Sequence, residues 1–322
     1  MKKTIALFTI LSTVIFFCCK NETATKEAVL LKEPTSIEEL GELLFFDPIL
    51  SRDSSISCAS CHKPEFAFAD NVPLSFGVDS LKGTRNTPSA MNLASRSFFF
   101  HDGRSESLED QAKGPMQNPV EMNMPLSTII ERLKRHQQYK TFFQKQFGQL
   151  PTIENLTKAL SDYERSLETA DTPFDDYQSK YDTTQFSESA KRGRLIFNQK
   201  GKCFDCHFGP DFTGDQFRNI GLFNGKELND SGRYVVTKKT TDLGKFKTPG
   251  LRNALVTAPY MHNGMFSTLK EVIDYYNEPG KVVPNSINRD TLLSKPLGLT
   301  PQEKADLEAF LISLTDRRFV KK

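Results

Sequence analysis

Two short cysteine motifs carry the clearest chemistry in this sequence. Each is a C-x-x-C-H segment, and the residues are Cys58, Cys61 and His62 in the first and Cys203, Cys206 and His207 in the second. Such a segment can hold one porphyrin, because two thiols add across its two vinyl groups and the adjacent histidine binds the iron. The sequence therefore predicts two covalently bound haem c groups, with His62 and His207 as axial iron ligands.

Other interpretations of these cysteines stay open at this point. Thiol redox sites and zinc sites also use C-x-x-C pairs, and the four cysteines together could form an all-thiolate zinc site. An exported protein could instead join them in disulfides. None of these alternatives explains why both pairs are followed at once by histidine.

The N-terminus has the pattern of an export signal. Lys2 and Lys3 precede an apolar run over residues 5–17, which is short for a membrane span but typical of a signal peptide. The run ends at Cys18 and Cys19, as in bacterial lipoproteins. We therefore expect residues 1–18 to be a signal peptide, with Cys19, or else Cys18, lipidated and the protein in the periplasm. An ordinary signal peptide with incidental cysteines is the alternative.

The charge composition gives no support for a nucleic-acid-binding function. The chain has 322 residues with 42 basic and 40 acidic side chains, a net charge of +2 that gives no reason to expect nucleic-acid binding. The length that remains after export suffices for one large or two ordinary domains.

Helical patterns dominate the rest of the chain. Apolar residues at helical spacing mark residues 153–167, residues 127–147 also read as helical, and capping boxes open helices at Thr268 and Thr300. Strand alternation is hard to find, and long connections cover residues 63–105 and 208–266. We expect a mainly α fold of two cytochrome c-like haem domains with long loops, over residues 32–178 and 179–322.

Ordered motifs around the cysteines resemble one known family. They are Leu44-Phe-Phe-Asp-Pro48, Arg85-Asn-Thr-Pro88, Asp102-Gly-Arg104, Gln111-Ala-Lys-Gly-Pro115, Asn118-Pro-Val-Glu-Met122, Thr248-Pro-Gly-Leu-Arg-Asn253, Ala258-Pro-Tyr-Met-His-Asn-Gly264 and Thr268-Leu-Lys-Glu271. The chain is similar, from about residue 38 to 314, to bacterial di-haem cytochrome c peroxidases, a superfamily that includes the methylamine-utilisation enzyme MauG.

The resemblance implies a division of labour between the haems. The first haem would react with hydrogen peroxide, with Glu121 as distal acid/base and Gln111 as a hydrogen-bond donor in the same pocket. The second haem would take electrons from a small cytochrome c or copper protein. Family members often form homodimers. The resemblance also implies a calcium ion held by the side chain of Asn86 and the carbonyls of Thr257 and Pro259.

Three departures from the family pattern bear on function. Val78 stands where many members have a distal histidine, so we expect a first haem that is open without reductive activation, unless a loop rearrangement brings another ligand. Tyr276 aligns with the axial methionine of the second haem, as in MauG, with Met261, Met265 or His262 as alternative ligands. His101 replaces the usual tryptophan between the haems, and the chain has no Trp at all.

Peroxide reduction is thus the leading interpretation. A MauG-like oxidase acting on a protein or small molecule is the second, favoured by Val78 and Tyr276. A non-enzymatic electron-transfer or sensor cytochrome is the third, and it would need both irons to be six-coordinate.

Overall fold

The computed structural model describes residues 30–320, and its compact unit begins at Glu33. The expected signal peptide and the lipidation candidates Cys18 and Cys19 lie outside the described residues. Within residues 30–320, no helix is both long and apolar enough to cross a membrane.

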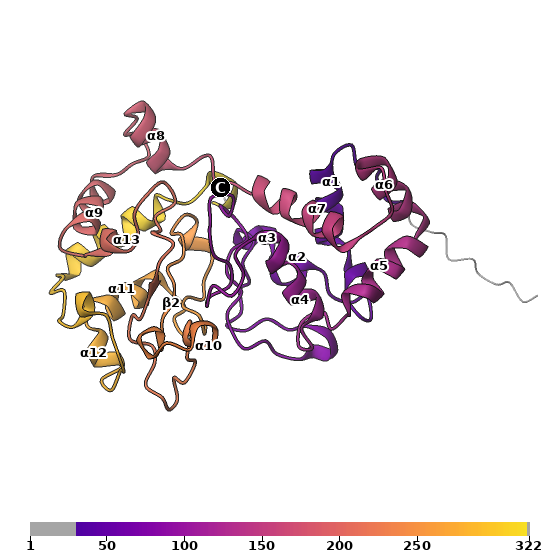
Figure 1. The fold of residues 1–322 in the computed structure, drawn as a ribbon. Coiled ribbons are helices and arrows are strands. Elements are labelled where there is room, and N and C mark those ends of the chain that lie inside the picture. The colour runs from indigo at the N-terminus through magenta and orange to yellow at the C-terminus, as the bar shows by residue number, and fades with distance from the viewer. Residues whose placement is uncertain (1–29, 321–322) are drawn as a thin grey trace, which may run out of the picture. The chain divides into compact units, whose positions relative to one another are not determined.

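Helices carry nearly all the regular structure, which confirms the mainly α prediction (Figure 1). The first half contains α1 (Ile37–Phe46), α2 (Cys58–Cys61), α3 (Leu108–Gln111), α4 (Lys113–Gln117), α5 (Leu126–Arg135), α6 (Gln137–Phe147) and α7 (Ile153–Ser166). The second half contains α8 (Pro173–Lys180), α9 (Glu188–Asn198), α10 (Tyr234–Thr237), α11 (Leu269–Asn277), α12 (Pro279–Val282) and α13 (Pro301–Ile312). The strands β1 (Phe217–Arg218) and β2 (Phe246–Lys247) form one short antiparallel pair.

A close helix pair organises the first half. Helices α1 and α7 cross at Gly41, where an added Cβ would lie 1.9 Å from the carbonyl oxygen of Ala159. Only glycine permits this approach, and it brings the buried faces of both helices together. Phe45 of α1 and Tyr163 of α7 then meet edge to face at 5.2 Å, beside the first cysteine motif.

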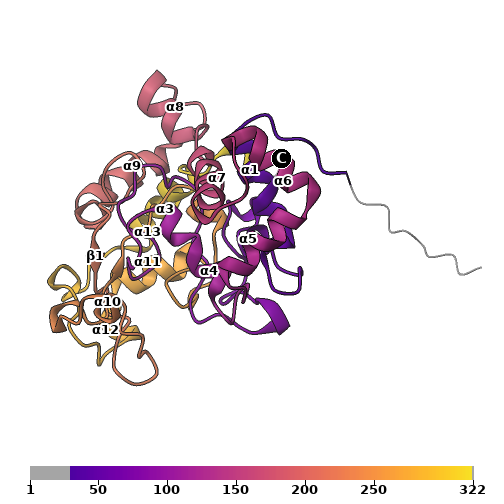
Figure 2. The ribbon, with the colours of Figure 1, turned by 45° about the vertical axis from the view of Figure 1, so that its right-hand side comes forward.

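The second half repeats this arrangement. Helices α9 and α13 cross at Gly193, where a Cβ would lie 1.9 Å from the carbonyl oxygen of Asp306. Phe197 and Phe310 pack across this contact at 5.1 Å, inside a phenylalanine-rich core to which Phe174 of α8 also belongs. Figure 2 shows α9 and α13 side by side. In both halves, the first helix of the pair leads into a C-x-x-C-H segment.

The helices expected from sequence are present. Both capping boxes are formed, by Thr268 with Glu271 at α11 and by Thr300 with Glu303 at α13. The stretch 127–147 is two helices, because the chain leaves the helical conformation at His136. Helix α11 ends at Asn277, and Pro279 opens the separate short helix α12.

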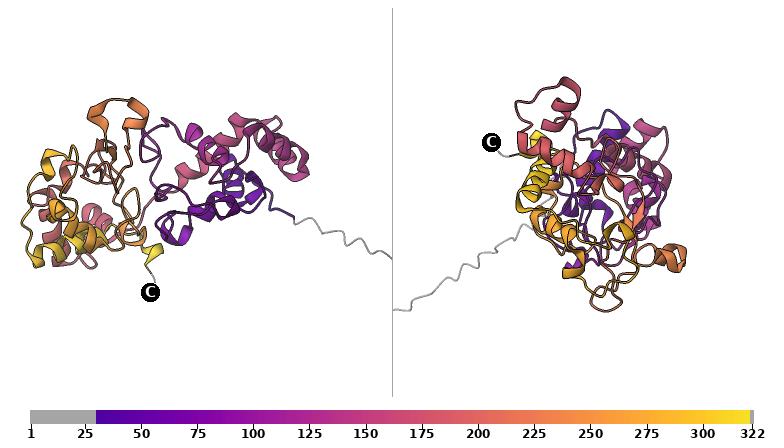
Figure 3. Two further views of the ribbon diagram at one scale, coloured as in Figure 1. Left: turned by 90° about the horizontal axis from the view of Figure 1, so that it is seen from below. Right: turned by 90° about the vertical axis from the view of Figure 1, so that its left-hand side faces the viewer.

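The long connections of the two halves meet each other. Lys247 donates its backbone N–H to the carbonyl of His101 at 2.8 Å, and Asn86 donates its own to the carbonyl of His262 at 2.8 Å. The left view of Figure 3 shows the purple connection of the first half beside the orange connections of the second. Residues 63–105 and 208–266 therefore form the contact region between the two halves.

Candidate haem sites and active site

The first cysteine motif is a short helix with a tethered histidine. Ser57 and Ser60 form a capping box that opens α2, and His62 follows its last residue. The Nδ1 atom of His62 lies 3.0 Å from the carbonyl oxygen of Phe68. Because a carbonyl only accepts, Nδ1 carries the proton and Nε2 is left with a lone pair for a metal.

The second motif has the same tether. The Nδ1 atom of His207 lies 2.9 Å from the carbonyl oxygen of Phe212, which again leaves Nε2 available. Burial lowers the pKa of both His62 and His207, so each ring stays neutral and able to bind iron. Fixing the ring through Nδ1 is the usual support of a histidine ligand.

The four thiols fit haem attachment better than the alternatives. All four are free, so neither pair forms a disulfide. Among the described residues, no three His, Cys, Asp or Glu side chains gather as a metal-holding group, which argues against the all-thiolate zinc site. Two free thiols beside a neutral, oriented imidazole, present twice, are the donor set that a covalent haem requires.

Glu121 lies beside the first motif. Its carboxylate accepts a hydrogen bond from the Asn118 side chain at 2.5 Å. Burial raises its pKa, whereas Asn118 and the nearby Arg104 guanidinium lower it. Burial also raises the pKa of the Cys61 thiol to about 11, with a smaller upward contribution from Glu121. The predicted acid/base is thus a partly buried carboxyl close to the first attachment cysteine.

Val78 lies beside the backbone of Glu121. It is fully buried, and its backbone N–H donates to the carbonyl of Glu121 at 2.8 Å. A Cβ on the preceding Gly77 would lie 2.4 Å from that same carbonyl oxygen, so the two segments touch through their backbones. The position expected to carry a distal histidine therefore does lie next to Glu121, and here it is aliphatic.

The structure shows no contact that fixes the side chain of Gln111. It is the last residue of α3 and partly buried, and its side chain has no hydrogen bond within residues 30–320.

Two adjacent tyrosines of α11 differ in their hydroxyl groups. Tyr275 donates its hydroxyl to the carbonyl of Ile220 at 2.7 Å. The Tyr276 hydroxyl has no hydrogen-bond partner in the described part of the chain. Burial raises the pKa of Tyr276, and Cys203 and Cys206 raise it further, which places its phenol near the second motif. The Tyr275 hydroxyl is therefore occupied by a backbone carbonyl, whereas that of Tyr276 is not hydrogen-bonded within residues 30–320.

The alternative iron ligands Met261, Met265 and His262 lie in two different surroundings. Met261 and Met265 pack in the same apolar cluster as Tyr276 and remain alternatives. His262 instead stacks on Phe246 at 3.8 Å. Burial lowers the pKa of His262, and the nearby His101 lowers it further. His262 therefore lies close to His101, in the contact region between the two halves.

His101, Asn86 and the loop through Thr257 and Pro259 lie where the long connections of the two halves meet. His101 is hydrogen-bonded through Nε2 to the carbonyl of Asn86 at 2.9 Å, and burial lowers its pKa to about 4. The Asn86 side chain donates to the carbonyls of Val72 and Pro73, so its oxygen points elsewhere. The carbonyls of Thr257 and Pro259 belong to the loop that leads into His262.

Comparison with known proteins identifies the family. Residues 35–183 match the family described as di-haem cytochrome c peroxidase. The methylamine utilization protein MauG of Methylorubrum extorquens is 38% identical over 277 residues, which cover 85% of this chain and 77% of that protein. The chain belongs to the di-haem cytochrome c peroxidase family.

Members with different activities match almost equally well. The cytochrome c551 peroxidase of Pseudomonas aeruginosa is 35% identical over 288 residues, covering 87% of this chain and 79% of that protein. The crystal structure of a MauG-like protein associated with microbial copper homeostasis superposes with a TM-score of 0.79 at 31% identity, over 90% of this chain and 93% of that one. Family membership implies two haem c groups but leaves open the choice between peroxidase and MauG-like oxidase.

Sequence reasoning overlooked several residues that shape the family site. Asn118 and Arg104 belong to two of the sequence motifs but had no assigned role, and both lower the pKa of Glu121. The carbonyls of Phe68 and Phe212 carry no side-chain signal. Only their similar place after each C-x-x-C-H segment could have indicated them.

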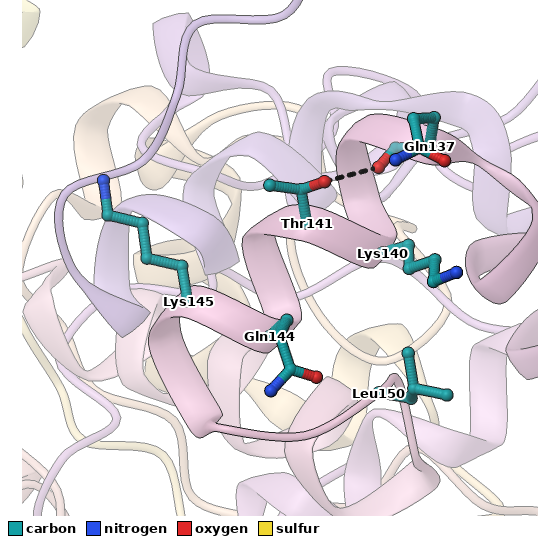
Figure 4. Close-up of a pocket in the computed structure, with 6 residues that line it drawn as sticks. All are labelled: Gln137, Lys140, Thr141, Gln144, Lys145 and Leu150. Carbon is teal, nitrogen blue, oxygen red and sulfur yellow. Dashed lines mark hydrogen bonds between the residues drawn. The ribbon is translucent and has the colours of Figure 1, made fainter.

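A surface hollow of about 300 Å³ lies elsewhere, on α6 (Figure 4). Gln137, Lys140, Thr141, Gln144, Lys145 and Leu150 line it. None of the predicted haem or catalytic residues contributes to it, so the site chemistry belongs to the loops around the two motifs.

Proposed function

We propose that this chain reduces hydrogen peroxide to water in the periplasm, with electrons from a small cytochrome c or copper protein. One observation carries the proposal: Glu121 is held beside the first cysteine motif by Asn118, next to a buried aliphatic Val78. Glu121 can thus transfer protons, whereas the aliphatic side chain at position 78 cannot bind the iron.

The reaction needs a group that moves one proton between two oxygens. A haem held by Cys58, Cys61 and His62 would supply the iron at which the peroxide O–O bond is cleaved, and the donor protein would supply the electrons. Glu121 in its carboxylate form takes the proton from the near oxygen and returns it to the leaving oxygen, which departs as water. Asn118 orients the carboxylate, and Gln111 is proposed as a further donor in this pocket.

Burial matters to this role because it raises the Glu121 pKa. A carboxyl with a raised pKa is a stronger base when ionised and is more readily reprotonated between the two steps. We therefore expect the peroxide reaction to slow as pH falls through the Glu121 pKa.

The second motif is proposed as the electron entry. Tyr276 would be the axial ligand opposite His207, and His101 would lie on the path between the haems. The calcium site at Asn86, Thr257 and Pro259, one haem in each of the ranges 32–178 and 179–322, a homodimer and a lipid anchor through Cys19 are further parts of this proposal.

A MauG-like oxidase is the second candidate. The Tyr276 hydroxyl, which has no hydrogen-bond partner within residues 30–320, favours it, because a phenolate ligand would stabilise ferric iron and disfavour simple electron relay to peroxide. In this case the substrate would be a protein or small molecule oxidised near the second haem.

Turnover separates the candidates. The fully oxidised holoprotein is mixed with one equivalent of hydrogen peroxide, and the haem absorption is followed before and after a reduced small cytochrome is added. Peroxidase function predicts a prompt spectral change that is reversed by two electrons from the donor. A change that persists in the presence of donor favours the oxidase, and no change even after the second haem has been reduced favours the non-enzymatic cytochrome.

A further inference from the structure

The tether of the first-half histidine continues toward the second half. The carbonyl oxygen of Phe68 accepts from Nδ1 of His62 at 3.0 Å and also from the backbone N–H of Ala90 at 3.0 Å. Asn86 lies four residues before Ala90 in the same connection. One hydrogen bond and a short run of backbone therefore join the tether of His62 to the carbonyl of Asn86.

The tether of the second-half histidine has a similar continuation. Phe212, whose carbonyl accepts from Nδ1 of His207 at 2.9 Å, is followed by the buried Thr213. The Thr213 hydroxyl donates to the carbonyl of Thr248 at 2.7 Å. Because Lys247 precedes Thr248, the tether of His207 is joined in this way to the backbone of Lys247.

His101 connects these two continuations. Its Nε2 atom lies 2.9 Å from the carbonyl oxygen of Asn86, and its own carbonyl accepts from the backbone N–H of Lys247 at 2.8 Å. Because a carbonyl only accepts, Nε2 carries the ring proton and donates it to Asn86. One residue therefore links the two histidine tethers, through its side chain to the first and through its backbone to the second.

We propose that His101 carries electrons between the two haems as a hydrogen-bonded bridge, through its Nε2 bond to Asn86, and not as an aromatic ring that is itself oxidised. The inference rests on the proposed electron entry at the second motif, and it names the atoms that connect this entry to the first haem. One electron leaves the reduced iron at His207 and arrives at the oxidised iron at His62. No proton changes place, because every hydrogen bond of the route keeps its donor.

The physical reason is that electronic coupling decays more slowly through covalent and hydrogen bonds than across a gap between unbonded atoms. The hydrogen bonds of the route all have ordinary lengths. Asn86 and Thr213 are buried, and the backbone N–H of Asn86 is fixed to the carbonyl of His262 at 2.8 Å, so water does not compete for these bonds. A neutral imidazole is also much harder to oxidise than an indole, which favours a bridge over a ring that holds the electron hole.

The test is the rate at which an electron redistributes between the haems of the oxidised holoprotein, after a laser-excited flavin has delivered less than one electron per molecule. Haem absorbance follows this step, whose rate does not depend on protein concentration. Rates are compared at matched driving force, from the potentials of both haems titrated in each variant. We expect His101→Phe, which keeps an aromatic ring but lacks the donor, to slow redistribution at least severalfold. His101→Gln, whose side-chain N–H can take the place of the Nε2 donor, should recover most of the rate.

A second pair of variants tests the route without changing His101. Thr213→Val removes the bond to the carbonyl of Thr248 and should also slow redistribution. Thr157→Val is its matched control, because the hydroxyl of the buried Thr157 donates to the carbonyl of Ile153 at 2.9 Å on α7, away from the route. This control should redistribute its electron as fast as wild type.

Three results would overturn the inference. They are a His101→Phe variant as fast as wild type, a His101→Gln variant as slow as His101→Phe, and an equal loss in Asp230→Asn. Asp230 accepts from the Arg85 guanidinium at 2.6 Å across the two halves but is not on the route, so an equal loss would mean that the rate reports only how the halves fit. If wild type itself shows no redistribution, the electron entry at the second motif fails, which is a failure of the proposed function and not of the bridge alone.

Discussion

A buried carboxyl on α7 should make the stability of this protein fall as pH rises. Glu164 is 9% exposed, and its carboxylate has no hydrogen bond within residues 30–320. The adjacent Arg165 is bound by Glu109 at 2.7 Å and by Asp162 at 3.2 Å. Burial therefore dominates and raises the pKa of Glu164 from its ordinary 4.5 to about 8.

The sign and size of the effect follow from proton linkage. The folded state keeps the Glu164 proton up to about pH 8, whereas the unfolded chain releases it near 4.5. Stability from this group is complete below 4.5 and is lost as pH rises to about 8, at about 1.4 kcal/mol per pH unit, or roughly 5 kcal/mol in all. Glutamine has nearly the same shape and no charge. Glu164→Gln should thus match wild type near pH 5 and exceed it by several kcal/mol above pH 8.

Urea unfolding of both holoproteins at about pH 5, 6.5 and 8.5 measures this difference. Glu154 lies on the same helix but is solvent-exposed, and hydrogen bonds lower its pKa. The stabilisation from Glu154 is therefore present above its ordinary pKa and is lost as pH falls. The control Glu154→Gln should be slightly less stable than wild type at high pH and equal to it at low pH, which is the opposite trend to Glu164→Gln. A difference between Glu164→Gln and wild type that is constant across pH would refute the reasoning.

Three other expectations concern the site and the helix crossings. Glu121→Gln should slow the peroxide reaction by about 10²- to 10⁴-fold with unchanged haem content, and a change below about threefold in stopped-flow rates would contradict the acid/base role. Tyr276→Phe should raise the potential of the second haem in a redox titration, whereas Tyr275→Phe should not; the reverse pattern would assign the ligand to Tyr275. Gly41→Ala and Gly193→Ala should each cost about 1–3 kcal/mol or more in denaturant unfolding, because the added methyl meets a backbone carbonyl. Stability equal to wild type would mean that the helices can separate without loss.

The parts of the fold that could be predicted are those encoded locally. Thr268 with Glu271 and Thr300 with Glu303 announce helix starts, because a capping box needs only residues three apart. The cysteine motifs are equally local.

The parts that could not be predicted depend on backbone atoms or distant partners. The tethers of His62 and His207 end on carbonyls, which any residue type supplies. Arg85 and Asp230 are 145 positions apart, and no periodic pattern joins them. The role of Glu121 came from resemblance alone, since an isolated glutamate after a turn is usually solvated; its burial and its bond to Asn118 required the structure. The hydroxyl of Tyr275 likewise ends on a backbone carbonyl, that of Ile220, 55 positions away.

We propose that the first haem reacts with peroxide without prior reduction, because Val78 replaces an iron-binding side chain beside Glu121. Stopped-flow mixing of the fully oxidised protein with hydrogen peroxide tests it most directly, with Val78→His and Val78→Ala beside wild type. We expect a prompt haem spectral change in wild type and Val78→Ala, and no change in Val78→His until the second haem is reduced. A wild-type protein that shows no spectral change until it is reduced would mean that the first haem is not open in the oxidised state.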